Sequence, residues 1–435
     1  MVPHLVTALN GPINELEQRM LEATPAIERW FRLEWMEHTP PFYCAVDVRN
    51  AGYKLAPVNS GLFPSGLNNL APEVLPLAVQ AAMAAIEKIC PEARNLLIIP
   101  EAGALNTFYL ESLQRLIGIF HQAGLNVRLG SLDPALKSAL RWTLPDGQAL
   151  QVEPVIRQRG RVGLKDFDPC TILLNTALTS GVPKPLLSVH EQYLLPPLHA
   201  GWTVRRLSRH FQIYEEVAKK FAKLLGMDPW LIHPLTQTCE VSWDQPDSLE
   251  GVADQVDTLL TKVRRKHKEY GIAEKPFVVI KAGDGRRGIA TMSVRDAKDL
   301  SAKLQRARET AREPARAASS KANNLIELVV QEGVPTFEQI NEAVAEPVVY
   351  MMDRYVVGGY YRVHAEHGHT ELLHSSRSHY VPLAFEPTVS LPRPGLKPGV
   401  SAPNRFYMYG VVARLALLAA SYELEATDPE ADALE

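Results

Sequence analysis

The sequence predicts a mixed α/β (α+β) fold in two parts, an N-terminal parallel-sheet domain and a second domain with a β-lid. Predicted strands and helices alternate through the first half of the chain, which is typical of a parallel sheet covered on both faces. In the second half a glycine-rich segment joins two short apolar strands. The chain has 435 residues, more than one core usually holds. We predict an N-terminal domain at residues 1–203, a second domain at 204–426 with a lid at about 275–335, and a frayed tail at 427–435.

Composition indicates a globular protein with an ordinary apolar and charged balance. Hydrophobic residues make up 46% of the chain and the formal net charge is −3, so no field of one sign steers it to nucleic acid or a membrane surface. No leader pattern opens the chain, and the apolar passage at residues 411–420 is shorter than the ~20 residues of a membrane span. The four cysteines form no C-x-x-C pair, which favours reduced thiols and a cytoplasmic location. Association into a homo-oligomer stays open.

Hydrophobic spacing gives the elements of the first domain. Leu16, Met20 and Ile27 recur at helical intervals, whereas the predicted strands are short continuous apolar runs. Glycine, proline, asparagine and serine crowd one passage and predict turns there. In chain order we predict a helix at 8–37, a strand at 42–48, the turn-rich passage at 50–69, a helix at 72–89, a strand at 95–99, a helix at 107–123, and strands at 126–129 and 170–175.

The second domain begins with two amphipathic helices. The first is closed by Gly226, with Pro229 shortly after it, the usual end of a helix. Later elements follow from alternating apolar and charged runs. In order we predict helices at 204–225 and 249–270, strands at 277–281 and 289–294, a charged helix at 295–312, and strands at 325–330, 348–352 and 360–365.

The glycine-rich segment at residues 281–288 is the most informative motif. Glycines let backbone N–H groups approach phosphate oxygens, and Lys281 at the strand end adds a positive charge. The G-x-x-x-x-G-K-[ST] order is absent and a strand follows, so this is not a Walker loop. A simple β-hairpin remains the alternative. The predicted phosphate contacts are Lys281, Gly283, Gly285, Arg286 and Gly288.

A second nucleotide-binding segment lies downstream. An apolar strand that enters a polar hinge offers backbone groups to adenine and a carboxylate to ribose; Gln331–Glu332 and Met352–Asp353 are the two candidates. Arg362, on the strand after a Gly-Gly turn, has the fork that grips a phosphate. An ion pair on a strand surface is the alternative role. A lysine, a glycine loop, a helix, a hinge and a strand arginine, in that order, resemble the ATP-grasp superfamily.

Longer segments resemble the proteobacterial glutamate–cysteine ligase family. They are Asp47 to Val58 (DVRNAGYKLAPV), Leu62 to Pro64, Asn68 to Leu70, Tyr193 to Trp202 (YLLPPLHAGW), Val330 to Phe337 (VQEGVPTF), Ala345 to Val363, and Phe406 to Glu425. The likeness covers nearly the whole chain. It implies an ATP-grasp enzyme that makes γ-glutamylcysteine, the first step of glutathione synthesis.

The resemblance implies a two-stage reaction. ATP with Mg²⁺ phosphorylates the side-chain carboxylate of glutamate, and the amine of cysteine displaces the phosphate. Lys281 and Arg362 are then the catalytic cations, and a lid keeps the acyl phosphate from water. Implied amino-acid contacts are Asp47, Arg49, Asn50, Lys54, Asn68, Asn69 and Asn106, and implied Mg²⁺ ligands are Glu371 and Glu366. A polar turn network that holds two elements together is the alternative for the Asp47–Asn69 group.

Some positions depart from the family pattern. Residues 102–105 are apolar or glycine where polar groups are expected, and Leu372, Leu373 and His374 stand where Mg²⁺ ligands are expected. Three hypotheses follow: a ligase for glutamate and cysteine, a ligase for another acid and amine, and a nucleotide-binding or partner-binding protein without catalysis.

Overall fold

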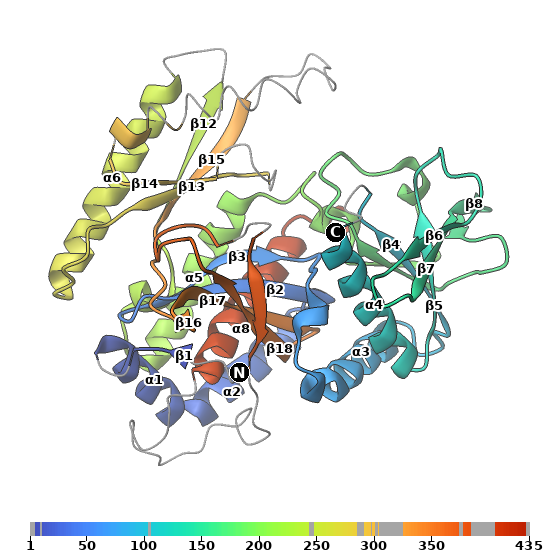
Figure 1. Ribbon diagram of the computed structural model, residues 1–435, viewed down its shortest axis with the longest axis horizontal. Coiled ribbons are helices and arrows are strands. Elements are labelled where there is room, and N and C mark those ends of the chain that lie inside the picture. Colours follow the sequence, from blue (N-terminus) through green and yellow to red (C-terminus); the bar gives the residue numbers. More distant parts are fainter. Residues whose placement is uncertain are drawn as a thin grey trace.

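The described residues form a mixed α/β fold with several sheets, as predicted (Figure 1). The computed structural model describes residues 5–8, 11–102, 106–242, 248–284, 291–296, 298–300, 303, 325–373, 377–383 and 405–431. Three sheets and their covering helices carry the architecture. We call them the parallel sheet, the central sheet and the lobe sheet.

The parallel sheet lies within the first half of the chain, as predicted. Its strand order is β11-β10-β4-β5-β7-β6, and every pair is parallel except β6 with β7. Helices α3 (Leu75–Ile89) and α4 (Thr107–Gln122) pack on Leu96 and Ile98, while Leu97 and Ile99 face a second apolar cluster. The strands are β4 (Asn95–Pro100), β5 (Asn126–Ser131), β6 (Leu140–Thr143), β7 (Ala149–Pro154), β10 (Thr171–Asn175) and β11 (Tyr193–Leu195).

The central sheet joins strands from both ends of the chain. β17 pairs with β18 on one side and with β2 on the other, and Asp47 lies opposite Val348. This pairing crosses the boundary predicted at residue 203, and the domain division stays a prediction. The strands are β1 (Leu5–Val6), β2 (Tyr43–Asn50), β3 (Leu55–Gly61), β16 (Gln339–Ile340), β17 (Ala343–Met352), β18 (Tyr355–His364) and β19 (His379–Pro382).

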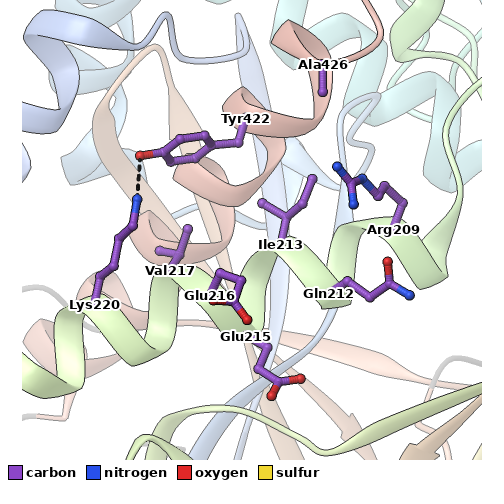
Figure 2. A pocket seen from close by; sticks show the side chains of 9 residues that line it. All are labelled: Arg209, Gln212, Ile213, Glu215, Glu216, Val217, Lys220, Tyr422 and Ala426. Carbon is purple, nitrogen blue, oxygen red and sulfur yellow. Dashed lines mark hydrogen bonds between the residues drawn. The ribbon is translucent and has the colours of Figure 1, made fainter.

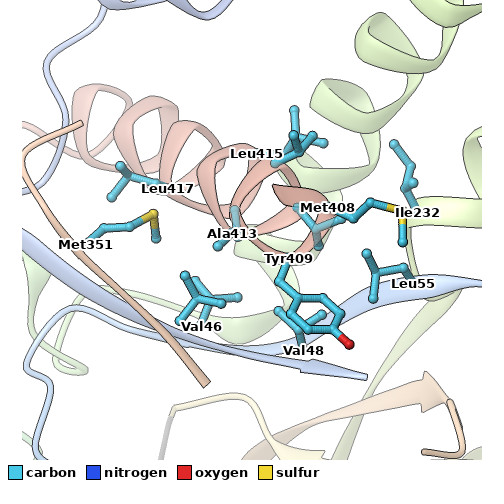
Figure 3. Close-up of a cluster of buried hydrophobic side chains, with 14 of the residues drawn as sticks. Val46, Val48, Leu55, Ile232, Met351, Met408, Tyr409, Ala413, Leu415 and Leu417 are labelled. Atoms are coloured by element: carbon cyan, nitrogen blue, oxygen red, sulfur yellow. The ribbon is translucent and has the colours of Figure 1, made fainter. Parts of the chain in front are cut away.

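Helix α8 (Phe406–Glu425) lies against one face of the central sheet (Figure 3). Side chains on nearly every side of α8 are buried, including Met408, Val412 and Leu417, which is typical of a helix inside a core. The helices α5 (Leu207–Leu225), α1 (Pro12–Glu22) and α2 (Thr24–Glu37) share this core. Within the described residues, no helix has both the length and the apolar character to cross a membrane.

The lobe sheet has the order β12-β15-β13-β14 and is covered by α6 (Ser248–Glu269). Figure 1 shows it as a lobe that extends from the rest of the molecule. Its strands are β12 (Thr236–Ser242), β13 (Val278–Ala282), β14 (Met292–Val294) and β15 (Leu325–Glu332). Its strands β13, β14 and β15 fall within the lid predicted at about 275–335, and that lid stays a prediction. Residues 285–290 and most of the helix predicted at 295–312 lie outside the described residues.

Two of the predicted segments have a different structure, and the predictions contained no counterpart of the strands β1, β6, β7, β8 (Ile156–Gln158), β9 (Arg161–Gly163), β11, β12, β16 and β19. The helix predicted at 8–37 is two helices, because Thr24-Pro25 begins a second one. The turn-rich passage at 50–69 contains β3. The remaining elements are the hairpin of β8 with β9, and the 3-10 turns η1 (Leu67–Asn69), η2 (Pro72–Val74), η3 (Lys184–Leu186), η4 (Leu198–Ala200) and η5 (Pro229–Ile232).

All four cysteines are free, and the Sγ atoms of Cys90 and Cys170 lie 2.7 Å apart.

Glu338 is a fully buried carboxyl between the central sheet and α8. Burial raises its pKa to about 7, although Tyr409 and Asn50 donate hydrogen bonds to it. Because the pKa of Glu338 is higher in the folded protein than the 4.5 of the unfolded chain, the protonated carboxyl contributes to stability below pH 4.5. This contribution is lost as pH rises to about 7. As pH rises from 4.5 to about 7, we expect the stability of Glu338→Gln to increase relative to that of the parent protein by about 3 kcal/mol.

Urea unfolding at several pH values measures this difference. Exposed Glu87→Gln is the control and should show a constant difference. A constant difference for Glu338→Gln as well would contradict the assignment.

Candidate functional site

Four charged side chains meet on the face of the central sheet opposite α8. Glu346 lies across from Arg362 in the β17–β18 ladder, and Asp47 and Arg49 alternate onto the same face of β2. Arg362 donates from Nη1 to Glu346 Oε1 (2.6 Å) and from Nη2 to Asp47 Oδ1 (3.1 Å). Arg49 donates from Nε to Glu346 Oε2 (2.8 Å). We call Asp47, Arg49, Glu346 and Arg362 the charged cluster.

Arg362 is only 6% exposed, and its Nε is buried without a partner among the described residues. Burial lowers its pKa, but Asp47 and Glu346 outweigh this and hold the pKa well above its usual range. The guanidinium is therefore always charged and keeps one donor for a further acceptor. In Arg49, by contrast, every guanidinium nitrogen has a partner, because Nη1 and Nη2 donate to the carbonyls of Val334 and Glu371.

Lys281 reaches the same cluster from the lobe sheet. Its Nζ donates to the Val58 carbonyl (2.5 Å) and to Gln331 Oε1 (2.7 Å). Burial lowers its pKa to about 8, with Asp47 and Glu346 acting to raise it and Arg49 to lower it. Lys281 and Arg362 thus share the same two carboxylates as electrostatic neighbours.

Gln331 and Gly283 lie beside Lys281. Gln331 is 1% exposed and its Nε2 is a second buried donor without a partner among the described residues. Gly283 belongs to the turn after β13, where a Cβ would lie 2.7 Å from Glu327 Oε1, so no larger residue fits without a shift. Gly285, Arg286 and Gly288 lie outside the described residues.

Lys54 and Glu332 form a separate, closed ion pair. Lys54 Nζ lies 2.9 Å from Glu332 Oε1 and 4.1 Å from the Trp230 ring centroid, and both charged side chains are at most 1% exposed. Glu332 also accepts from Trp230 Nε1 and Leu235 N. Of the two hinge candidates, Gln331–Glu332 lies beside Lys281. Met352–Asp353 lies at the far end of β17, about 20 Å from Glu346 at strand rise.

We expect Lys54→Met to destabilise the protein by about 3 kcal/mol, because it leaves Glu332 charged and buried. Urea unfolding measures this loss. Lys54→Met with Glu332→Leu should recover much of it, since both charges are then gone. A double variant no more stable than Lys54→Met would argue against a mainly structural pair.

The predicted asparagines lie in three settings. Asn68 donates to Glu111, Asn69 donates to the Gly66 carbonyl, and Asn106 caps α4 by accepting from Tyr109 N. This region adjoins the charged cluster, because the ring of Phe108 stacks on Tyr380, which lies opposite Arg362 in the sheet. Asn50 instead faces Glu338 on the α8 side.

Glu366 and Glu371 lie in the turn after β18. Glu366 pairs with Arg377 (2.7 Å), and Glu371 Oε2 accepts from Gly368 N (2.7 Å). The Glu371 carbonyl contacts Arg49, so the turn touches the charged cluster. No three His, Cys, Asp or Glu side chains in the described part of the chain are placed to hold a metal ion. His374 lies outside it.

Glu346 was absent from the sequence predictions, although it holds both arginines of the cluster. The strands predicted at 348–352 and 360–365 were not paired with each other; pairing them as a hairpin would have brought Glu346 near Arg362. A two-residue turn with an unbroken ladder would pair Glu346 with Tyr361. A bulge between Tyr350 and Met351 shifts the register by one residue, and this shift brings Glu346 opposite Arg362.

A surface pocket of about 520 Å³ lies elsewhere, between α5 and the end of α8 (Figure 2). Its lining includes Arg209, Glu216, Lys220 and Tyr422, and Lys220 donates to the Tyr422 hydroxyl (3.2 Å). None of the predicted site residues lines it. We place the candidate site at the charged cluster, since its unpaired buried donors point to a ligand and the pocket offers no such group.

Comparisons with known proteins agree with one family. The family described as "Glutamate-cysteine ligase" matches residues 17–424. A crystal structure from Methylobacillus flagellatus KT, provisionally named a gamma-glutamylcysteine synthetase, is 47% identical and covers 98% of this chain and 100% of its own, with a TM-score of 0.88. A glutathione synthetase-like effector from Globodera pallida (10% identity, 84% and 83% coverage) has a TM-score of 0.35, too low to support an argument. No curated protein matches the chain.

Proposed function

The chain belongs to the glutamate–cysteine ligase family, and on that premise we propose that it is an ATP-dependent ligase that joins glutamate to cysteine. The product is γ-glutamylcysteine, with ADP and phosphate released. The observation that carries the proposal is the shared position of Lys281 and Arg362 beside Asp47 and Glu346. Two cations from different sheets at one cluster suit the charge of a transferring phosphoryl group.

The residues of the charged cluster and of β15 fit a nucleoside triphosphate. Arg362 Nε and Gln331 Nε2 are buried donors without described partners, and such groups cost free energy unless an acceptor reaches them. Phosphate oxygens would satisfy Arg362, and an adenine acceptor would satisfy Gln331 at the hinge. The lobe sheet would act as the ATP-grasp lid, since it supplies Lys281 and extends from the rest of the fold (Figure 1).

Glu366 and Glu371 fit Mg²⁺ in chemistry. Mg²⁺ usually takes one or two carboxylates from a protein and completes its shell with phosphate and water. When bound, the ion would neutralise phosphate charge. The chain's own residues would do the rest: Lys281 and Arg362 hold the phosphates, Asp47 orients the amino acid that is phosphorylated on its side chain, and Arg49 keeps Glu346 in place.

The test is product formation from defined substrates. Pure protein with ATP, Mg²⁺, glutamate and cysteine should release ADP and γ-glutamylcysteine, measured by coupled assay and mass spectrometry. Turnover no higher than that of Lys281→Ala would overturn the proposal. ADP release with another amino-acid pair, and none with glutamate and cysteine, would favour the ligase of different specificity. ATP binding without Mg²⁺ dependence and without turnover would favour a non-catalytic binding protein.

A further inference from the structure

A buried hydrogen-bonded chain runs from α8 through α5 to β3. Arg205 donates from Nε and Nη2 to Glu423 Oε2 (3.0 and 2.9 Å). His210 Nδ1 lies 3.2 Å from the same oxygen, and His210 Nε2 lies 2.7 Å from Ser60 Oγ. Ser60, Arg205, His210 and Glu423 are each at most 1% exposed. We call these four residues the buried relay.

The protonation states of the buried relay follow from its contacts. Burial raises the pKa of Glu423, but Arg205 and His210 outweigh this and hold it at about 2. The carboxylate is therefore ionised and can only accept, so His210 Nδ1 carries a proton. Burial and Arg205 lower the pKa of His210 despite Glu423, which favours the neutral ring. Its Nε2 then accepts a hydrogen bond from the Ser60 hydroxyl (2.7 Å).

This order of Ser, His and Glu matches that of a hydrolase triad, but the burial argues against catalysis. Ser60 is 0% exposed, so a substrate carbonyl has no approach to its hydroxyl. The buried relay can therefore act on the charged cluster only through β3, the strand that contains Ser60.

Strand β3 contacts both Lys281 and Asp47 through a bulge. Asp47 pairs with Asn59 and Val48 with Pro57, which leaves Val58 as the extra residue of a bulge. The Val58 carbonyl accepts from Lys281, and Asn59 Nδ2 donates to Asp47 Oδ2 (3.1 Å). A bulge lacks ladder support at its extra residue, so it needs another anchor. Ser60 supplies one from the opposite face of the strand.

We propose that His210, fixed by Glu423 and Arg205, is a positioning residue that holds the β3 bulge so that Val58 and Asn59 orient Lys281 and Asp47. An effect of His210 on ATP binding rests on the proposed function. The effect of His210 on the position of Lys281 is argued from the hydrogen bonds alone.

The first test reads Lys281 directly. In full-length protein labelled with ¹³C-lysine, NMR titration gives the pKa of Lys281, assigned by Lys281→Arg. Ser60→Ala should raise this pKa by at least about one unit toward 10.5, because a loosened strand admits water and relieves the desolvation. His210→Phe, which keeps the ring volume without the acceptor, should do the same. His210→Gln, whose amide can still accept from Ser60, should restore most of the parent value.

The control is Ser421→Ala, since Ser421 is also 0% exposed and its hydroxyl lies within hydrogen-bond distance of the Thr39 carbonyl (2.6 Å) and of Glu425 Oε1 (3.3 Å). It should lose similar stability without moving the pKa of Lys281. Equal pKa values in Ser60→Ala, His210→Phe and Ser421→Ala would overturn the inference.

The second test measures MgATP affinity by calorimetry. Ser60→Ala should weaken binding roughly tenfold, the effect of a misplaced charged hydrogen bond, and Ser421→Ala should not. If the parent protein binds no MgATP, the proposed function fails while the NMR comparison still decides the positioning role. If it binds and Ser60→Ala binds equally well, the positioning role fails while the proposed function stands.

Discussion

Arg362→Gln is expected to reduce turnover at least ~10³-fold, the scale on which an arginine acts at a transferring phosphoryl group. The loss has two physical causes. The variant removes the buried guanidinium whose Nε is free for a phosphate oxygen. It also leaves Asp47 and Glu346 with less positive charge beside them, so Lys281 is drawn toward these carboxylates. Rate of ADP release at saturating substrates is the measurement.

Stability must be separated from catalysis in this variant. Removing one partner of a buried pair destabilises by about 3 kcal/mol, so urea unfolding accompanies the kinetics. Arg414→Gln is the matched control: Arg414 also pairs with a glutamate, Glu28 at 2.7 Å, and also has a buried Nε without a described partner. It should keep full turnover. Arg362→Lys keeps the charge without the fork and should still lose roughly 10²-fold. A folded Arg362→Gln enzyme with parental turnover would refute the role.

Lys281 should take up a proton when ATP binds. Its pKa of about 8 in the free protein reflects burial of the ammonium. A triphosphate favours the charged form and raises the pKa, so binding near pH 8 should take up roughly half a proton, and near pH 7 about a tenth. Calorimetry in buffers of different ionisation enthalpy measures this uptake.

Because ATP binding is coupled to proton uptake by Lys281, the affinity for ATP depends on pH. Above about pH 8 the free enzyme holds Lys281 neutral, so ATP affinity should fall as pH rises further. Lys281→Arg is the control, because arginine keeps the charge and does not titrate in this range. The Lys281→Arg variant should show no proton uptake on ATP binding near pH 8. The same uptake in Lys281→Arg would assign the proton to another group.

Local elements could be predicted from the sequence, because their signals are local. Helix α5 ends at Gly226, which adopts the left-handed conformation (φ 61°) that glycine allows. The apolar runs at residues 95–99 and 170–175 became neighbouring parallel strands. Strand β3 was hidden, because Gly52, Pro57, Gly61 and Pro64 give that passage the composition of turns.

Long-range pairing could not be predicted in the same way. Nothing near Asp47 in sequence indicates that β2 lies beside β17. The charged cluster depends on this pairing and on the bulge that brings Glu346 opposite Arg362. Sequence reasoning therefore named Asp47, Arg49, Lys281 and Arg362 without the carboxylate that joins the two arginines. The Gly-Gly turn predicted before Arg362 is wrong, because Gly358 and Gly359 lie inside β18 and pair with β17. Gly358 has φ 147° and marks the bulge; glycine in a strand is the usual signal of one.

The pairing of β2 with β17 has a consequence for biosynthesis. About 300 residues separate Asp47 from Val348, and at roughly 5–20 residues per second a ribosome needs some tens of seconds to make them. During that interval the nascent β2–β3 hairpin has neither its neighbouring strand nor the α8 helix that buries its apolar face. Its open edge is then a template for pairing with other chains, so chaperone protection of the emerging polypeptide should matter most before translation reaches β17.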